Sequence, residues 1–173
     1  MLILVSGGAA SGKSEFAESL AASAPGLPRI YLATMKLWDA ECEARVRKHR
    51  AMRAGKGFTT VERPEDLAGL ELPAGCTVLL EDLSNLCANE FFGPAGPAGT
   101  EERVAAGLER LAAQAGRAVV VTNELFSDGE DYGPGTAAYL DCLAALNRRA
   151  AALAGEVYEV VCGIPVRWKG GAP

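Results

Sequence analysis

The stretch LILVSGGAASGKS, residues 2–14, decides the fold class of this chain. An apolar run leads into a glycine-rich turn with the spacing Gly7-x-x-x-x-Gly12-Lys13-Ser14, and a helix is predicted to follow over residues 13–24. A strand, such a turn and a helix in this order form a phosphate-binding loop, in which backbone N–H groups and the positive end of the helix face a polyphosphate. We therefore expect Lys13 to reach the β- and γ-phosphates of a nucleotide and the Ser14 hydroxyl to bind Mg²⁺.

Apolar runs recur along the rest of the chain and alternate with helical patterns. Several of them are almost continuously apolar, which is typical of strands buried on both faces of a parallel sheet. The pattern predicts one α/β domain over residues 1–173, P-loop NTPase-like, with a mostly parallel central sheet flanked by helices. Besides 2–6, strands are predicted at 30–34, 77–81, 118–122 and 156–161, edge strands at 58–62 and 165–169, and helices at 39–54, 101–115 and 136–154.

Composition restricts the function classes. The 173 residues are 49% hydrophobic and 23% charged, as in globular proteins. The net charge of -5 argues against general nucleic-acid binding, and no apolar run approaches the ~18–20 residues of a membrane span, so no membrane insertion is expected. No basic segment precedes the first apolar run, which disfavours a signal peptide. Five scattered cysteines without a Cys-x-x-Cys pair favour reduced thiols and a cytoplasmic location.

Acidic residues follow the predicted strand at 77–81. The sequence TVLLEDL places Glu81 and Asp82 where the carboxyl end of a parallel strand meets the ligand crevice of an α/β sheet. A phosphate-binding loop needs such a carboxylate for its metal, so both residues are candidate Mg²⁺ ligands together with Ser14. The alternative is that Asp82 only caps a helix or turn. Asn123 and Glu124 end the strand at 118–122 on the same edge, and a structural role fits them as well as a functional one.

The segment RVRKHRAMR, residues 45–53, gathers five basic residues around the only histidine of the chain. If it is helical, Arg45, His49 and Arg53 lie four residues apart and share one face. The neighbouring cations disfavour imidazolium, which keeps His49 neutral and able to attack phosphorus to form a phosphoramidate. The alternative is a solvated basic face or a subunit contact, in which the histidine has no chemical role.

The motifs together, in one order and spacing, resemble a known family. They are GGAASGKS after the first strand, IYLAT, the ARVRKHR helix, LLEDL, VVVTNE and EVYEVVCGIPVRWK. From Leu2 to about Lys169 the chain is similar to the bifunctional adenosylcobinamide kinase/adenosylcobinamide-phosphate guanylyltransferase of cobalamin biosynthesis. The resemblance implies that a nucleoside triphosphate, GTP or ATP, phosphorylates adenosylcobinamide. It also implies that GMP passes from GTP through an enzyme histidine to adenosylcobinamide phosphate, giving adenosyl-GDP-cobinamide.

The resemblance also implies site residues and an assembly. By position, the histidine that carries GMP is His49, and Lys13 acts on the phosphates. The family forms trimers, so a homotrimer is expected, with nucleotide sites near subunit boundaries. The nucleotide-binding residues implied in this way are Gly7, Gly8, Ala9, Ala10, Ser11, Gly12, Lys13, Ser14, Thr34, Met35, Lys36, Arg50, Ala51, Met52, Arg53, Glu62 and Glu81.

The chain departs from the family pattern in two places. Many relatives have Arg where Ala10 stands, and their VTNE motif is commonly followed by an arginine-containing helix that residues 125–147 lack. Nucleotide binding is still expected despite this difference, whereas the corrinoid contacts and the kinase step stay open. Two other readings also stay open at this point. One is another P-loop kinase of a small molecule, and the other is a nucleotide-binding regulatory module that hydrolyses slowly.

Overall fold

The computed structural model describes residues 1–24, 28–36, 55–126 and 132–171. The helix predicted over residues 39–54 lies outside this part, and so does His49. The described elements, in chain order, are β1 (Leu2–Ser6), α1 (Lys13–Ala22), β2 (Arg29–Ala33), β3 (Phe58–Glu62), η1 (Leu67–Gly69), β4 (Thr77–Glu81), α3 (Leu83–Phe91), α4 (Thr100–Gln114), β5 (Arg117–Val121), α5 (Pro134–Leu153), β6 (Glu156–Val161) and β7 (Ile164–Lys169).

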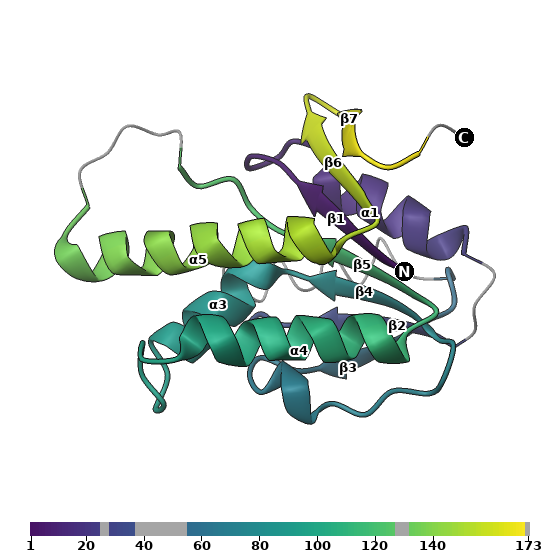
Figure 1. The fold of residues 1–173 in the computed structure, drawn as a ribbon. Coiled ribbons are helices and arrows are strands. Elements are labelled where there is room, and N and C mark those ends of the chain that lie inside the picture. Colours follow the sequence, from purple (N-terminus) through teal and green to yellow (C-terminus); the bar gives the residue numbers. More distant parts are fainter. Residues whose placement is uncertain (25–27, 37–54, 127–131, 172–173) are drawn as a thin grey trace.

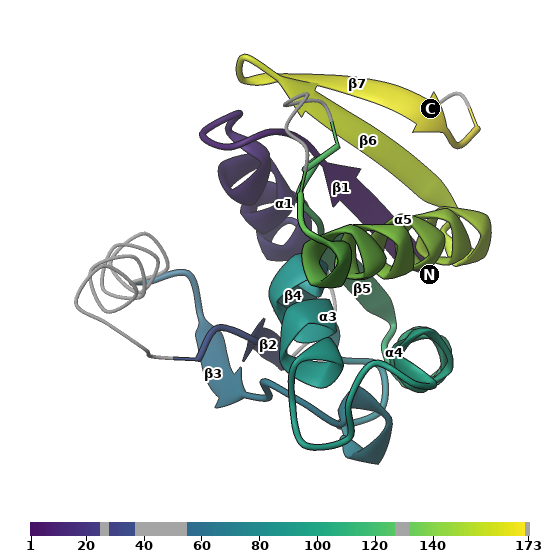
Figure 2. The same ribbon diagram turned by 90° about the vertical axis from the view of Figure 1, so that its left-hand side faces the viewer.

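The strands form a seven-stranded sheet in the order β3-β2-β4-β5-β1-β6-β7. All neighbouring strands are parallel except β6 and β7, which form an antiparallel hairpin at one end of the sheet (Figure 2). The predicted fold class is therefore confirmed, a mostly parallel sheet flanked by helices. The two predicted edge strands are confirmed as well, since β3 and β7 stand at the two ends of the sheet.

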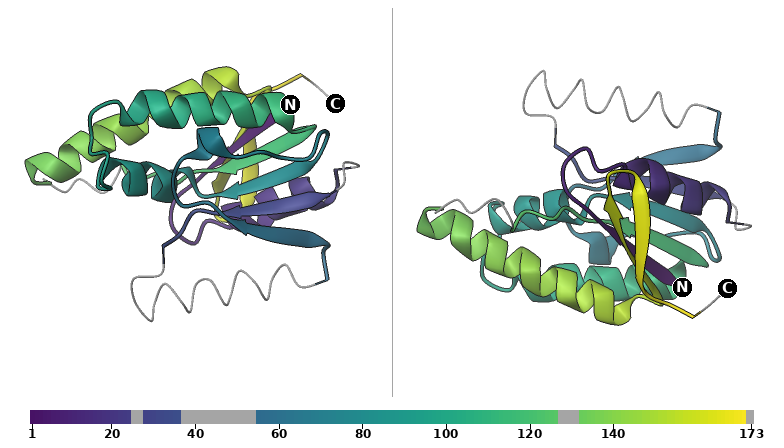
Figure 3. Two further views of the ribbon diagram at one scale, coloured as in Figure 1. Left: turned by 90° about the horizontal axis from the view of Figure 1, so that it is seen from below. Right: turned by 90° about the horizontal axis from the view of Figure 1, so that it is seen from above.

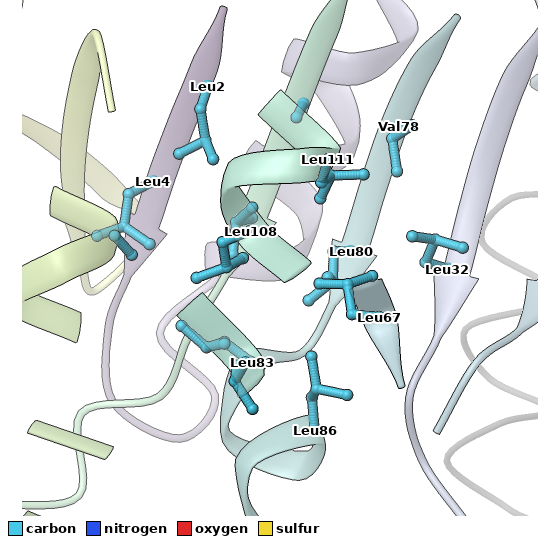
Figure 4. Packing of buried hydrophobic residues seen from close by; sticks show 14 of the residues in the cluster. Leu2, Leu4, Leu32, Leu67, Val78, Leu80, Leu83, Leu86, Leu108 and Leu111 are labelled. Carbon is cyan, nitrogen blue, oxygen red and sulfur yellow. The ribbon is translucent and has the colours of Figure 1, made fainter. Parts of the chain in front are cut away.

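Helices cover both faces of the sheet (Figure 3). Successive side chains of a strand point to opposite faces, and in β1 both sets are buried. Leu2 and Leu4 pack in a cluster with residues of α3, α4 and α5, whereas Ile3 and Val5 pack with residues of α1. Figure 4 shows the first cluster, where leucines from the strands meet leucines from the helices. This two-sided burial explains why the inner strands β1, β4 and β5 are almost continuously apolar.

Sequence patterns predicted the long helices and missed two short elements. The predicted helices 13–24, 101–115 and 136–154 differ from α1, α4 and α5 by at most two residues at either end. The helix α3 and the single turn η1 were not predicted. α3 begins directly after Asp82, whose side chain accepts a hydrogen bond from the Asn85 amide, so one residue both ends the acidic motif and caps a helix. Within the described ranges, no helix is long and apolar enough to cross a membrane.

Candidate nucleotide site

The loop between β1 and α1 is held in a fixed path by backbone hydrogen bonds. The Ser11 amide donates to the Gly8 carbonyl over 3.3 Å, and the Gly163 amide, in the turn between β6 and β7, donates to the Ser11 carbonyl over 2.8 Å. The Glu124 amide donates to the Gly7 carbonyl over 3.1 Å. The loop is thus tied to the turn between β6 and β7 and to the segment after β5, and these bonds fix the path of its backbone.

Two glycines of this loop cannot be replaced without strain. A Cβ atom on Gly7 would lie 2.6 Å from Ser11 Oγ and 2.7 Å from the Val160 carbonyl oxygen. Gly12 has a φ of 90°, in the left-handed region that favours glycine, and it immediately precedes α1. The spacing Gly7-x-x-x-x-Gly12 therefore reflects one close approach and one backbone conformation. α1 starts at Lys13, so its N-terminal amides face the loop, as phosphate binding requires.

Lys13 is buried beside this loop, with 8% of its surface exposed. Its Nζ donates a hydrogen bond of 2.9 Å to the Gly8 carbonyl. Burial lowers the pKa of the Lys13 ammonium, and the carboxylates of Asp82 and Glu81 oppose that effect. A buried cation beside this loop is suited to a polyphosphate, because a phosphate oxygen is a stronger acceptor for an ammonium than a neutral carbonyl.

Asp82 lies at the centre of a hydrogen-bonded network at the end of β4. Its carboxylate accepts from the Asn85 amide over 2.7 Å and from Asn85 Nδ2 and Asn123 Nδ2 over 3.0 and 3.1 Å. Burial raises the pKa of Asp82, and the Asn85 amide is the strongest opposing influence. Thr34 Oγ1 donates to the Asp82 carbonyl over 2.8 Å and accepts from the Asp82 amide over 2.7 Å. Thr34 and Asp82, predicted from separate motifs, are thus brought together.

Other predicted residues lie farther along the same edge. Lys36 forms an ion pair with Glu65, and Met35 beside it is half-buried. Glu81 Oε2 accepts a 3.1 Å hydrogen bond from the Tyr31 hydroxyl. In the strand order, β5 alone separates β4 from β1, and β2 and β3 follow beyond β4. At ~4.8 Å per strand, Glu81 stands roughly 10 Å from the end of β1 and Glu62 roughly 19 Å, so Glu62 is too remote for the phosphates that the loop would hold.

Several residues of the network were not predicted as site residues. Ser84 Oγ accepts from the backbone amide and Nδ2 of Asn123, over 3.0 and 3.1 Å. Asn89 Nδ2 donates to the carbonyls of Thr34 and Pro64, over 2.7 and 3.0 Å. An aspartate at position 82 could have predicted a helix that begins directly after it. No local sequence pattern predicts the role of Asn89, because its hydrogen-bond partners are distant in sequence. His49 and the predicted contacts Arg50, Ala51, Met52 and Arg53 lie outside the described residues.

The fold and the loop define a P-loop nucleotide-binding protein. Sequence comparison specifies it further: a family model described as cobinamide kinase / cobinamide phosphate guanyltransferase matches residues 3–168. The chain belongs to that family. It is a bifunctional enzyme of cobalamin biosynthesis, which acts as adenosylcobinamide kinase and as adenosylcobinamide-phosphate guanylyltransferase. Among the readings left open by the sequence, the two that lack guanylyl transfer are thereby set aside.

Curated relatives match almost end to end. The chain is 33% identical to the bifunctional adenosylcobalamin biosynthesis protein CobU of Salmonella typhimurium strain LT2, over 98% of this chain and 100% of that one. It is 34% identical to the corresponding protein CobP of Pseudomonas aeruginosa, over 96% of each chain.

Solved structures share the fold at low sequence identity. The flagellar accessory protein FlaH of Methanocaldococcus jannaschii has a TM-score of 0.51 at 11% identity, covering 98% of this chain and 78% of that one. A Pyrococcus horikoshii OT3 protein has a TM-score of 0.53 at 9% identity, covering 98% and 86%. These similarities concern the architecture alone.

Proposed function

We propose that the two activities share the loop at residues 7–14 and that His49 carries GMP between them. In the kinase step, the hydroxyl oxygen of adenosylcobinamide attacks the γ-phosphorus of a nucleoside triphosphate. The new O–P bond forms as the bond to the β-phosphate oxygen breaks, the hydroxyl proton passes to water, and a nucleoside diphosphate leaves. Such a step requires mainly positioning and charge stabilisation, which agrees with a loop of fixed amides and a buried Lys13.

In the guanylyl step, the neutral His49 imidazole attacks the α-phosphorus of GTP. A P–N bond forms and pyrophosphate leaves. A phosphate oxygen of adenosylcobinamide phosphate then attacks the same phosphorus, the P–N bond breaks, and the imidazole is released as the product adenosyl-GDP-cobinamide forms. Support comes from the sequence, because His49 is the only histidine of the chain and Arg50 and Arg53 follow it closely. Such arginines suit the phosphate oxygens of GTP.

The observation that carries this proposal is the convergence of Lys13, Asp82 and Thr34 at the carboxyl edge of the sheet. Phosphates bound at residues 7–14 would lie beyond the end of β1, while Glu62 lies four strands away on the edge strand β3. We propose that GTP extends along the edge, with its guanosine toward Glu62. The spacing of the strands supports this direction, because Glu62 is too distant to serve the phosphates.

We propose Mg²⁺ as the metal of the site, bound by Ser14 and the carboxylates of Glu81 and Asp82. Hydroxyl and carboxylate oxygens are the ligands that Mg²⁺ prefers, and in nucleotide sites phosphate oxygens and water complete its coordination. Among the described residues no three His, Cys, Asp or Glu side chains form a metal site by themselves. The donor set therefore fits an ion that the nucleotide helps to bind. When bound, Mg²⁺ neutralises charge on the phosphates.

Two further expectations extend the proposal to the whole protein. We propose a homotrimer, and the supporting observation is an apolar face on the edge strand β7, where Ile164, Val166 and Trp168 alternate and are all exposed. We also propose a cytoplasmic location. Four of the five cysteines are described, and Cys76, Cys87, Cys142 and Cys162 are all free thiols, which agrees with a reducing compartment.

The test is an assay of adenosylcobinamide with GTP and Mg²⁺ that follows GDP and pyrophosphate separately. We expect both products, each dependent on the corrinoid during turnover, and accumulation of adenosyl-GDP-cobinamide. Starting instead from adenosylcobinamide phosphate, we expect pyrophosphate without GDP. Release of GDP with no corrinoid carrying GMP would contradict the guanylyl half of the proposal.

A further inference from the structure

An exposed aromatic cluster lies where the end of α3 meets the first half of α5. Phe92, directly after α3, is 64% exposed, although it is a large apolar side chain. Its ring centroid is 5.0 Å from that of Phe91 and 5.6 Å from that of Tyr139 in α5. Phe91 and Tyr139 are themselves 6.0 Å apart. The rings of Phe91 and Tyr139 pack against the Phe92 ring and fix its position, while most of the Phe92 surface faces water.

The two segments that carry this cluster contain no charged residue of their own, and the cation Arg103 of α4 donates to the backbone carbonyls of Gly96 and Ala98. Residues 91–99, FFGPAGPAG, and residues 132–140, YGPGTAAYL, contain no Asp, Glu, Lys, Arg or His, in a chain with 39 residues of the first four kinds (17 Lys+Arg and 22 Asp+Glu). Most of these residues are exposed, including the whole first turn of α5. Exposed segments of a protein are normally rich in charge. We call the two segments together the neutral face, and its aromatic centre is Phe92.

The neutral face is continuous with the nucleotide site. The Tyr139 hydroxyl donates a 3.1 Å hydrogen bond to the Ser84 carbonyl, and Ser84 Oγ accepts from Asn123, whose Nδ2 also donates to Asp82. At ~1.5 Å per residue along α3, Phe92 stands roughly 15 Å from Asp82. Both α3 and the start of α5 extend past the carboxyl ends of the strands (Figure 1).

This position matches what the substrate requires. Cobinamide is a flat macrocycle edged by methyl groups and uncharged carboxamides, and its reacting hydroxyl sits at the end of a flexible side arm. When the hydroxyl reaches the γ-phosphate at residues 7–14, the macrocycle must lie outside the phosphate site by the length of that arm. An aromatic surface without charged residues, outside the phosphate site, would bind such a ring by apolar contact and stacking.

We propose that the neutral face binds the corrin macrocycle of cobinamide, with Phe92 as its central contact. The inference rests on the proposed function, which supplies the corrinoid substrate and places its hydroxyl at the loop. The second occupant that an exposed apolar face could have is another copy of this chain. We have assigned the contact with a second copy to the apolar face of β7, so the neutral face, which is continuous with the nucleotide site, is left for the substrate.

The test measures cobinamide binding by equilibrium dialysis, and the visible absorbance of the corrinoid reports the bound fraction. GTP and Mg²⁺ are each left out in turn. We compare wild type with Phe92→Ala and Phe92→Asp. The matched control is Leu153→Asp, which places the same charge on a 40% exposed apolar residue at the other end of α5. We expect Phe92→Ala to raise the dissociation constant of cobinamide severalfold and Phe92→Asp to raise it at least ~10-fold. Leu153→Asp should stay within twofold of wild type.

The outcomes separate the inference from the proposed function. The GTP affinity and thermal unfolding midpoint of each variant report whether the nucleotide site is still folded. If folded Phe92→Asp binds cobinamide as tightly as wild type, the proposal that the neutral face binds the macrocycle is overturned. The proposed function is then unaffected. Wild-type protein that binds no cobinamide overturns both. A change of sedimentation in Phe92→Asp with unchanged cobinamide affinity assigns the face to a second copy and overturns the inference.

Discussion

At the residue scale, the site contains charged groups in environments that disfavour their charges. Burial lowers the pKa of Lys13 and raises that of Asp82, so each group is stabilised by its partners less than it is destabilised by leaving water. Opposite charges near each other offset part of this free-energy cost. A bound nucleotide with its metal would offset more of it, so the arrangement favours the ligand-bound state over the free state.

The first prediction concerns the charge of Lys13. Because its folded pKa lies below the ordinary value of 10.5, the unfolded chain binds more protons between those two values, and the free energy of unfolding rises with pH there. Below the folded pKa the full cost of the buried charge is present. Lys13→Met should therefore make the nucleotide-free protein more stable than wild type at pH 7, while lowering kinase turnover by about 10²-fold or more. Denaturant unfolding between pH 7 and 10.5 measures this.

The advantage of the Lys13→Met protein should shrink as the pH approaches 10.5. Arg148→Met, which removes an exposed cation, serves as the control and should show no such pH dependence. If Lys13→Met is less stable than wild type at pH 7 and the difference does not change with pH, the ammonium is not destabilising and the account of this residue is wrong.

The residues of the loop at 7–14 could be predicted because every feature is local in sequence. Gly7 and Gly12 were predicted from their spacing, and the structure adds the physical reasons, a close approach at Gly7 and a positive φ at Gly12. The convergence of Thr34, Asp82 and Asn123 could be predicted only as far as their common edge. Their hydrogen bonds join strands that are distant in sequence, and no pattern in one chain specifies such partners. The role of His49 stays a prediction.

At the scale of elements, α3 illustrates how a functional motif can hide a structural one. LLEDL was interpreted as a metal motif, and the alternative that Asp82 caps a helix is confirmed by its bond to the Asn85 amide. The two roles are compatible, since a capping carboxylate has oxygen lone pairs to spare. The same residue therefore starts α3 and stands in the candidate nucleotide site, so it fixes where α3, and the neutral face at the end of α3, begin.

The second prediction concerns the contact between α4 and η1. A glycine inside a helix normally costs ~1 kcal/mol relative to alanine, so the sequence alone would favour Gly107→Ala as stabilising. A Cβ atom on Gly107, however, would lie 2.7 Å from Leu67 Cβ and 3.1 Å from the Ala68 amide nitrogen. We expect Gly107→Ala to lower the free energy of unfolding by about 1–3 kcal/mol, because the added methyl group overfills a packed interface. Chemical denaturation measures the change.

Gly135→Ala is the matched control for this element. Gly135 lies in the first turn of α5 with nothing within 4 Å of an added Cβ. There only the helix propensity of the residue changes, so we expect Gly135→Ala to raise the free energy of unfolding by a few tenths of a kcal/mol up to ~1 kcal/mol. Equal gains at both positions would mean that α4 does not pack closely on η1.

At the scale of the whole molecule, the fold class followed from alternation of apolar strands and helices, which is a property of the complete chain. The order of the strands did not follow, because it depends on which strands pair across long connections. That order decides how far each predicted residue lies from the loop at residues 7–14. It places β4 near β1 and β3 far from it, so Glu81 lies nearer to that loop than Glu62, although the same resemblance implied both.

The third prediction concerns assembly through β7. Trp168 is 70% exposed and Ile164 66% exposed on one face of this edge strand. We expect sedimentation equilibrium to show a trimer for the wild-type protein and smaller species for Ile164→Glu/Trp168→Glu, because a buried carboxylate without a partner is costly at an interface. Leu153→Glu, at an exposed position of α5, should remain trimeric. A monomeric wild-type protein would refute the trimer, and a trimeric double variant would exclude β7 from the interface.

The central claim is that one chain carries GMP covalently on His49 and uses the loop at residues 7–14 for the phosphates. The most direct measurement is the intact mass of the protein after incubation with GTP and Mg²⁺ alone, repeated with His49→Ala. The account predicts one added GMP per wild-type chain, labile in acid and stable in alkali as a phosphoramidate is, and none in His49→Ala, which should still phosphorylate adenosylcobinamide. An adduct that persists in His49→Ala, or a wild-type protein that turns over GTP to adenosyl-GDP-cobinamide without any adduct, would contradict it.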